Sequence, residues 1–119
     1  MKNKGNAVII KMMKNKRTII KELKTTLTDQ FGEDIKDVIL FGSRVKGKAH
    51  KNSDYDVLII LNADYDWEYR YKITSIVYEM ELKHDIFIDI KIISANELYH
   101  SIKGKHPLYQ DALHEGIYA

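Results

Sequence analysis

Three short apolar runs, each about the length of a β-strand, alternate in this chain with segments of helical periodicity. The runs are DVILF at 37–41, YDVLIIL at 55–61 and DIFIDIKII at 85–93. Because side chains alternate across a strand, the third run places its isoleucines on one face and Asp85, Phe87, Asp89 and Lys91 on the other. Few folds accommodate strands and helices in such close alternation, so this pattern limits the architecture more than any other feature.

The intervals between the runs have the signals of helices. Apolar residues recur at helical spacing over 18–31 and over 66–83. The residues SANE at 94–97 form a capping box for a third helix that should stop near Gly104, and Pro107 suits the first turn of a fourth. The order α-β-α-β-α-β-α-α predicts a small α/β (α+β) domain. We expect a mixed sheet of three or more strands with helices packed on one side, which leaves an open face for charged side chains.

Composition is that of an ordinary globular protein. The chain has 119 residues, 45% of them hydrophobic and 30% charged, which suits a single domain. It has no cysteine, so disulfides and thiolate metal sites are excluded. No signal peptide and no apolar stretch of about 20 residues is present. We therefore expect a soluble cytoplasmic protein without a membrane partner.

The positive charge is concentrated at the N-terminus. Residues 1–24 contain eight Lys or Arg and a single acid, Glu22, although the net charge of the whole chain is only +2. We interpret residues 1–17 as a basic arm or a helix extension, and 18–119 as the folded domain. No aromatic residue is interleaved with these lysines, so a stacking surface for single strands is missing and a nucleic-acid partner is not expected.

Two aspartates stand at the start of the second apolar run. Asp54 and Asp56 are two residues apart, so their side chains leave the same face of an extended backbone. Two carboxylates this close repel each other unless a cation lies between them, and Mg²⁺ prefers oxygen ligands of this kind. A third acid on the neighbouring strand would complete a two-metal site. We predict Asp89 in that role, with Asp85 as the alternative because it shares the polar face.

A Gly-Ser pair precedes the aspartates by ten residues. Glycine at the end of a strand lets a phosphate approach the backbone, and we expect Ser43 to cap a short helix over 44–49 whose N-terminus attracts anions. Arg44 adjoins this turn and can add a positive charge. A phosphate site made of Gly42, Ser43 and Arg44 beside a metal site suits a nucleoside triphosphate.

The stretch FGSRVKGKAHKNSDYDVLII at 41–60 resembles the signature of the polymerase-beta-like nucleotidyltransferases, and the short chain resembles their minimal nucleotidyltransferase (MNT) branch. The resemblance covers residue 18 to the C-terminus and implies the nucleotidyltransferase fold. It implies that Gly42 and Ser43 bind the triphosphate of ATP. It also implies that Asp54, Asp56 and Asp89 are the catalytic carboxylates and that together they hold two Mg²⁺ ions.

The same resemblance implies a biological role. Minimal domains of this type are antitoxins of HEPN-domain ribonuclease toxins, with which they form hetero-oligomers. The implied reaction is AMP transfer from ATP to a tyrosine hydroxyl of that toxin. Two alternatives remain open at this point: a nucleotidyltransferase that acts on small molecules, and a non-catalytic antitoxin that only binds its partner.

Overall fold

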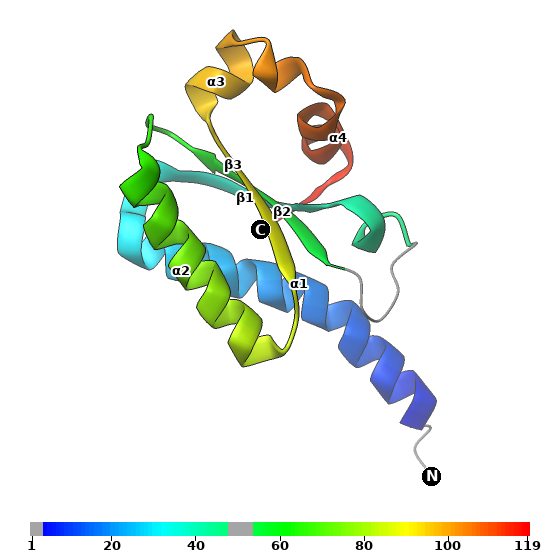
Figure 1. Ribbon diagram of the computed structural model, residues 1–119. Helices are drawn as coiled ribbons and strands as arrows, with labels where there is room; N and C mark the ends of the chain where they lie inside the picture. The colour runs from blue at the N-terminus through cyan, green and yellow to red at the C-terminus, as the bar shows by residue number, and fades with distance from the viewer. Residues whose placement is uncertain (1–3, 48–53) are drawn as a thin grey trace.

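The fold is a four-stranded sheet between two layers of helices (Figure 1). The computed structural model describes residues 4–47 and 54–119, with residues 4–15 described by their backbone alone. The strands lie in the order β3-β2-β1-β4. Their bounds are Ile35–Phe41 for β1, Tyr55–Leu61 for β2, Ile88–Ser94 for β3 and Ile117–Tyr118 for β4.

The sheet is mixed, as the sequence predicted. β2 pairs antiparallel with β1 and parallel with β3, which places the N-terminal ends of β2 and β3 at the same edge of the sheet. β4 was not predicted. It pairs antiparallel with the C-terminal half of β1 over two residues, which are too few to show an alternating pattern in the sequence. β1 and β2 are thereby the two inner strands, and both are almost wholly buried.

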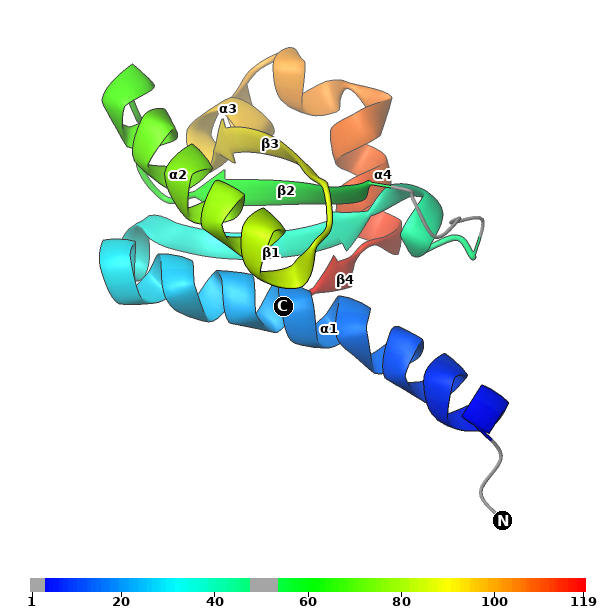
Figure 2. The ribbon, with the colours of Figure 1, turned by 60° about the horizontal axis from the view of Figure 1, so that its bottom comes forward.

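The helices match the predicted segments with shifts at their ends. They are α1 (Lys4–Phe31), α2 (Trp67–His84), α3 (Ala95–His100) and α4 (Pro107–Glu115). α1 is a single helix from Lys4 onward, and Figure 2 shows its N-terminal part projecting beyond the sheet. α3 ends at His100, before the predicted stop near Gly104, and a 3-10 turn over Lys103–Lys105 follows it. No helix in the described part of the chain is both long and apolar enough to cross a membrane.

Two capping interactions explain where helices begin. The Ser94 hydroxyl accepts a hydrogen bond from the Glu97 backbone N–H at 3.0 Å, as the capping box predicted. The Asp66 carboxylate accepts one from the Tyr69 N–H at 2.9 Å at the start of α2. At the other end of α2, Asp85 adopts the left-handed conformation with φ 53°, which ends the helix and turns the chain toward β3.

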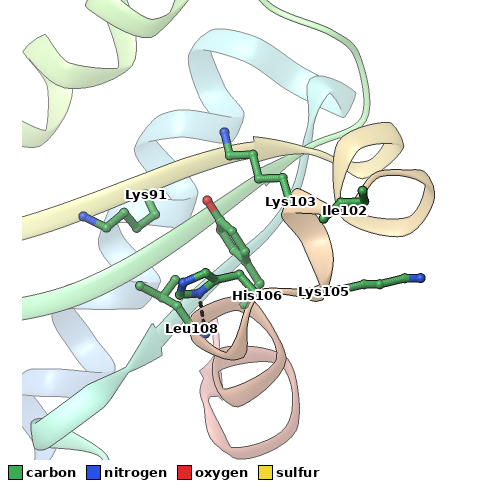
Figure 3. Close-up of a pocket in the computed structure, with 7 residues that line it drawn as sticks. Lys91, Ile102, Lys103, Lys105, His106 and Leu108 are labelled. Carbon is green, nitrogen blue, oxygen red and sulfur yellow. Dashed lines mark hydrogen bonds between the residues drawn. The ribbon is translucent and has the colours of Figure 1, made fainter.

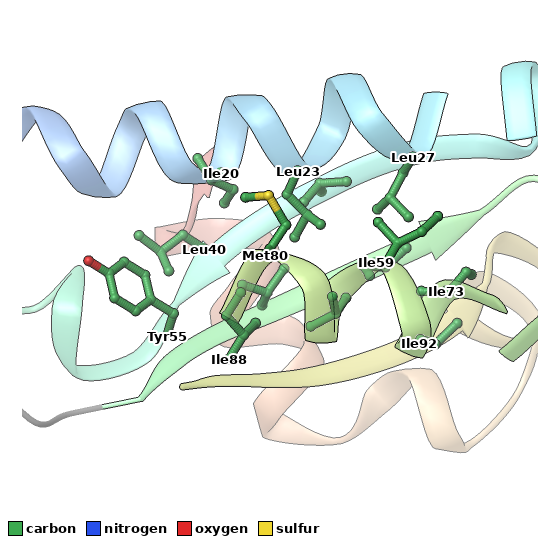
Figure 4. Packing of buried hydrophobic residues seen from close by; sticks show 14 of the residues in the cluster. Ile20, Leu23, Leu27, Leu40, Tyr55, Ile59, Ile73, Met80, Ile88 and Ile92 are labelled. Atoms are coloured by element: carbon green, nitrogen blue, oxygen red, sulfur yellow. The ribbon is translucent and has the colours of Figure 1, made fainter. Parts of the chain in front are cut away.

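The first face of the sheet is covered by α1 and α2. The buried core there combines one side of every long strand with the apolar stripes of both helices, as Figure 4 shows. From α1 it includes the predicted residues Ile19, Ile20, Leu23 and Leu27. The helical periodicity of the sequence thus identified this core correctly.

The second face is not open along its whole length, and in this respect the prediction that helices pack on one side was wrong. α3 and α4 cover part of it, with Leu98, Tyr109 and Ala112 packed against Ile39, Leu58, Ile60 and Ile93. The physical reason is that β1 and β2 are apolar on both sides, so each face needs a cover. Around the N-terminal ends of β2 and β3, the second face carries Asp56 and Asp89 instead of apolar side chains.

Candidate active site

Two aspartates stand at the N-terminal end of β2, on the second face of the sheet. Asp56 is the second residue of β2 and Asp54 directly precedes the strand. Asp56 alternates with Leu58 and Ile60, which belong to the second core, so its side chain is on the second face. Asp54 is exposed and Asp56 is partly buried. The carboxyl group of Asp56 therefore lies where the apolar cover of this face ends.

Asp89 lies beside Asp56 on the neighbouring strand. The two residues are direct partners in the parallel register of β2 and β3, which puts their backbones roughly 5 Å apart. Burial raises the pKa of Asp56, and the nearby carboxylates of Asp89 and Asp54 raise it further. The structure thus pairs Asp56 with Asp89, and it places Asp54 near enough for its charge to act on Asp56.

Asp85, the alternative third carboxylate, lies elsewhere. It is the C-terminal cap of α2 rather than a residue of β3, which begins only at Ile88. It lines a separate hollow with Tyr78 and Leu82 of α2 and with Phe87. It also does not contribute to the raised pKa of Asp56. The geometry therefore favours Asp89.

Gly42 contacts the site directly. It follows β1, whose last residue Phe41 pairs with Asp56, and its φ of 80° suits glycine alone. A Cβ at this position would overlap the Asp56 carboxylate oxygen Oδ2 and lie 3.2 Å from the Asp56 carboxyl carbon. Glycine is required here for two reasons: its backbone conformation and the close approach of Asp56.

The turn after Gly42 differs from the prediction. The expected helix over 44–49 is a 3-10 turn of three residues, Gly42–Arg44, with positions 48 and 49 outside the described residues. Ser43 does not cap it, because the residue in the cap position is Phe41 and no side chain bonds there. The Gly42 carbonyl instead accepts from the N–H groups of Val45 and Lys46 at 3.1 and 3.2 Å. A turn this short has little helix dipole, so its attraction for phosphate must come from local N–H groups and cations.

Arg44 stacks on an aromatic ring of the first core. Its guanidinium carbon lies 3.9 Å from the centroid of the Tyr55 ring, a cation–π contact. Tyr55 belongs to the core on the first face, so Arg44 leans toward α1, and Lys16 donates a hydrogen bond to its carbonyl at 3.3 Å. To contact a phosphate on the second face, Arg44 would have to leave the Tyr55 ring.

Two lysines near the site were not among the site residues predicted from the sequence, where Lys46 was as readily a simple surface charge as a cation for phosphate. Lys91 follows Asp89 on the same face of β3, and its Nζ lies 3.5 Å from Asp89 Oδ1. The alternating pattern of β3 did place Lys91 beside Asp89, and that signal could have identified it. Lys46 pairs with Asp111 of α4 at 3.1 Å, which ties the turn after Gly42 to the helix on the second face. No local pattern connects residues so distant in sequence.

The chemical type of the side chains at this site suits a magnesium ion, and their positions suit it in part. Carboxylate oxygens are the ligands Mg²⁺ prefers. Burial and then the charges of Asp89 and Asp54 raise the pKa of Asp56, and a cation would relieve the repulsion among these carboxylates. In the described residues, no group of three His, Asp or Glu side chains converges tightly enough to hold a metal alone. Because Mg²⁺ commonly takes only one or two carboxylates and completes its shell with water and substrate phosphates, the donor set still fits.

Known sequences match most of this chain. The sequence model of the family described as "Polymerase beta, Nucleotidyltransferase" matches residues 21–112. Two similar proteins come from Methanocaldococcus jannaschii. "Putative protein adenylyltransferase MJ0604" is 29% identical over 102 residues, which are 86% of this chain and 95% of that protein. "Putative protein adenylyltransferase MJ0141" is 37% identical over 70 residues, or 59% of this chain and 71% of that protein.

Solved structures match the fold. A toxin–antitoxin crystal structure with AMP-PNP aligns with a TM-score of 0.54 at 22% identity, over 85% of this chain and 69% of the matched chain. A structure of the toxin–antitoxin MntA-HpeT aligns with a TM-score of 0.52 at 21% identity, over 87% and 70% of the two chains. At this level of identity the likeness concerns the fold, and it confirms the fold class predicted from the sequence.

Proposed function

The chain belongs to the polymerase beta nucleotidyltransferase family, and from this premise we propose that it transfers AMP from ATP to a hydroxyl group of a partner protein. The observation that carries the proposal is the pairing of Asp56 with Asp89 on adjacent strands, next to a glycine turn that leaves room for the Asp56 carboxylate. The relatives named as protein adenylyltransferases support a protein as acceptor. A cytoplasmic location, expected from the sequence, is part of the same proposal.

We assign metal binding to the three carboxylates. Asp54, Asp56 and Asp89 would together hold two Mg²⁺ ions. When bound at these residues, the metal would neutralise charge on the reacting phosphates. Asp89 has a second task, which is to accept the proton of the attacking hydroxyl on a carboxylate oxygen. It is suited to this because it is half exposed and lies at the outer side of the carboxylate group, on the edge strand β3.

We assign binding of the triphosphate to the turn after β1. Gly42 lets a phosphate come close to the backbone, Ser43 offers its N–H and hydroxyl groups, and Arg44 supplies a positive charge when it leaves Tyr55. In the reaction, the acceptor oxygen bonds to the α-phosphorus of ATP. The bond from that phosphorus to the oxygen bridging to the β-phosphorus breaks, and pyrophosphate leaves.

A partner protein is supported by an apolar surface on α2. Four large side chains on its outer side are strongly exposed, and we call them the α2 stripe: Trp67, Tyr71, Tyr78 and Leu82. Between them, the hydroxyls of Thr74 and Ser75 donate to carbonyls of their own helix, so burying the stripe leaves neither of these two hydroxyls without a partner. Exposed apolar surface of this kind is typical of protein interfaces.

The partner we propose is a HEPN-domain toxin, with a tyrosine as acceptor. The structural neighbours are toxin–antitoxin proteins, and one of them was solved with AMP-PNP, an analogue of ATP. On this proposal the chain acts as an antitoxin that modifies its toxin and so inactivates it. The α2 stripe gives the two proteins a way to remain in a complex.

The test is to express the chain with a HEPN-domain toxin encoded beside it and to add ATP and Mg²⁺. We expect the intact mass of the toxin to rise by one or more AMP units, located on tyrosine by fragmentation. With Asp56→Asn the toxin should keep its mass while the complex still forms. A toxin that stays unmodified with the unaltered chain, in a complex that nevertheless forms, would establish a purely binding antitoxin instead.

A further inference from the structure

A cavity of about 540 Å³ lies on the second face of the sheet, between β3 and the segment joining α3 to α4. We call it the β3–α4 pocket. In Figure 3 Lys91 lies on β3 at one side of it, with its ammonium group directed away from the other labelled residues, while Lys103, Lys105 and His106 come from the joining segment. Ile102 and Leu108 supply apolar surface between these groups. Neither the proposed metal site nor the glycine turn includes any of these residues.

The charges of the pocket are of one kind. Three lysines line it, and none of its lining residues is acidic. Two of the lysines have acidic neighbours outside the lining: Lys91 pairs with Asp89 at 3.5 Å, and Lys103 pairs with Glu97 at 3.6 Å. Both are exposed pairs, which hold weakly and exchange readily for other carboxylates. The pocket is therefore complementary to a ligand with negative charge at its ends.

The surface between the charges is apolar and uncovered. Ile102 is 86% exposed, the highest value of any large hydrophobic residue described. Leu108 is half-buried, and Tyr109 is buried against the sheet. The backbone here needs no further partner at the start of α4, because the Leu108 N–H already donates to His106 Nδ1 at 3.1 Å. An aromatic side chain fits such a surface, since it would cover Ile102 without displacing a hydrogen bond.

The position of the pocket relates it to the chemistry. Across the sheet the order is Gly42 at the end of β1, then Asp56 on β2, then Asp89 on the edge strand β3. In an in-line displacement the attacking and leaving oxygens lie on opposite sides of the phosphorus. If pyrophosphate leaves toward Gly42, the attacking hydroxyl comes from the side of Asp89. The pocket begins on that side, at Lys91, two residues and roughly 7 Å along β3 from Asp89.

We propose that the β3–α4 pocket docks the acceptor, a segment of the partner protein in which a tyrosine is flanked by acidic residues. This inference rests on the proposed function, because it uses the direction of attack that AMP transfer requires. An adenine ring is a poorer candidate for the same pocket: it is uncharged, and it would make no use of the lysines.

The probe is a short peptide with one tyrosine and two glutamates on each side. It is added to the chain at low salt, and backbone and side-chain NMR shifts are followed. We expect the largest shifts at Lys91, Ile102, Lys103 and Leu108, and we expect added salt to weaken binding. A peptide with lysines in place of the glutamates should bind much more weakly. One with phenylalanine in place of tyrosine should bind as well as the original, although it offers no hydroxyl.

Two matched variants separate the pocket from general electrostatics. Lys103→Gln with Lys105→Gln removes two charges from the pocket, and we expect the Kd of the acidic peptide to rise about five- to tenfold. Lys36→Gln with Lys72→Gln removes two charges from exposed positions on β1 and α2, and we expect no change beyond about twofold. In AMP transfer to the peptide, the pocket variant should raise KM for the peptide and leave KM for ATP unchanged.

Three results would overturn the proposal: no binding of the acidic peptide, shifts located away from the pocket, or equal Kd values for the two variants. Shifts of the pocket residues on adding AMP-PNP with Mg²⁺ would also overturn it and make the pocket the nucleotide site. Failure of the proposed function gives a different pattern. The acidic peptide would bind in the pocket, while AMP-PNP would not bind at all and no AMP would be transferred.

Discussion

The two faces of the sheet share the same strands but serve different purposes. On the first face, 17 buried residues from α1, α2 and the long strands form a continuous core. On the second face the core has eight buried residues, and α3 and α4 leave the N-terminal ends of β2 and β3 uncovered. There the positions that would otherwise continue the core hold Asp56 and Asp89. The first face is covered by the larger core, and the second leaves part of its surface uncovered around the carboxylates.

The largest effect should separate Asp89 from Asp85. Asp89→Asn removes a metal ligand and the proton acceptor, and we expect AMP transfer to fall about a thousandfold or more, about 4 kcal/mol in the barrier. Asp85→Asn is the matched control. It removes a carboxylate only four residues earlier in the chain, at the end of α2, and that carboxylate lies away from Asp56. Rates of AMP transfer under identical conditions measure both. Equal losses would mean that the second face alone does not define the site.

Cavities in the two cores should differ in cost. Leu23→Ala empties a fully buried position in the first core, and we expect the free energy of unfolding to fall by about 3–4 kcal/mol. Leu98→Ala opens the smaller second core, which can relax toward the uncovered region, so about 2 kcal/mol is expected. Chemical denaturation gives both values. A larger loss for Leu98→Ala would show that the second core is the main source of stability.

Gly42 and Gly47 give a matched pair of glycine replacements. Both have positive φ, 80° and 72°, but a Cβ at Gly47 meets no atom within 4 Å, while one at Gly42 overlaps Asp56. Gly47→Ala should therefore cost only backbone strain, about 1 kcal/mol. Gly42→Ala should cost about 1 kcal/mol more and also lower AMP transfer, because Asp56 must move. If both variants lose the same stability and keep the same activity, the contact with Asp56 is unimportant.

The pH dependence of stability should report the crowded carboxylates without metal. Burial and the charges of Asp89 and Asp54 raise the pKa of Asp56 above its ordinary 3.8, so the folded state keeps this proton to higher pH than the unfolded chain. Stability should therefore decrease as the pH rises from about 4 through the folded-state pKa. Asp56→Asn should remove this decrease and be neutral or slightly stabilising at pH 7.

Added Mg²⁺ provides the second half of that test. It should raise the midpoint of thermal unfolding for the unaltered chain, because the metal binds the carboxylates only in the folded state. It should have little effect on Asp56→Asn, because that variant lacks one of the proposed ligands. Thermal unfolding at several pH values, with and without Mg²⁺, measures both parts. An unaltered chain that ignores Mg²⁺ would contradict the metal assignment.

The smallest effect is expected on the first face, where ion pairs join α1 to α2. Glu22 of α1 bonds Lys83 and His84 of α2, and these hydrogen bonds lower the pKa of Glu22 below its ordinary value of 4.5. This contribution is present above about pH 4.5 and is lost as the pH falls through the lower, folded-state pKa. Because these side chains remain partly exposed to solvent, Glu22→Gln should cost about 1 kcal/mol or less, measured by denaturation at pH 7 and pH 3.

Patterns within one segment were reliable guides to this fold. The alternation of β3 identified the polar face with Asp89, helical spacing identified the core residues of α1, and the capping box identified Ser94. The spacing of Asp54 and Asp56 indicated a shared face before any fold was known. Each of these signals depends on the backbone geometry of a few neighbouring residues, which is why the sequence carries them.

Other features required the folded chain. A two-residue β4, the cover of the second face by α3 and α4, and the tie between Lys46 and Asp111 all join residues far apart in sequence. The choice of Asp89 over Asp85 depended on where β3 begins and on its register with β2, since a shift of one residue would turn Asp89 to the other face. The sequence by itself determined which residues are able to do chemistry. Only the tertiary structure decided which of them meet, because pairing of distant strands is settled by packing rather than by local preference.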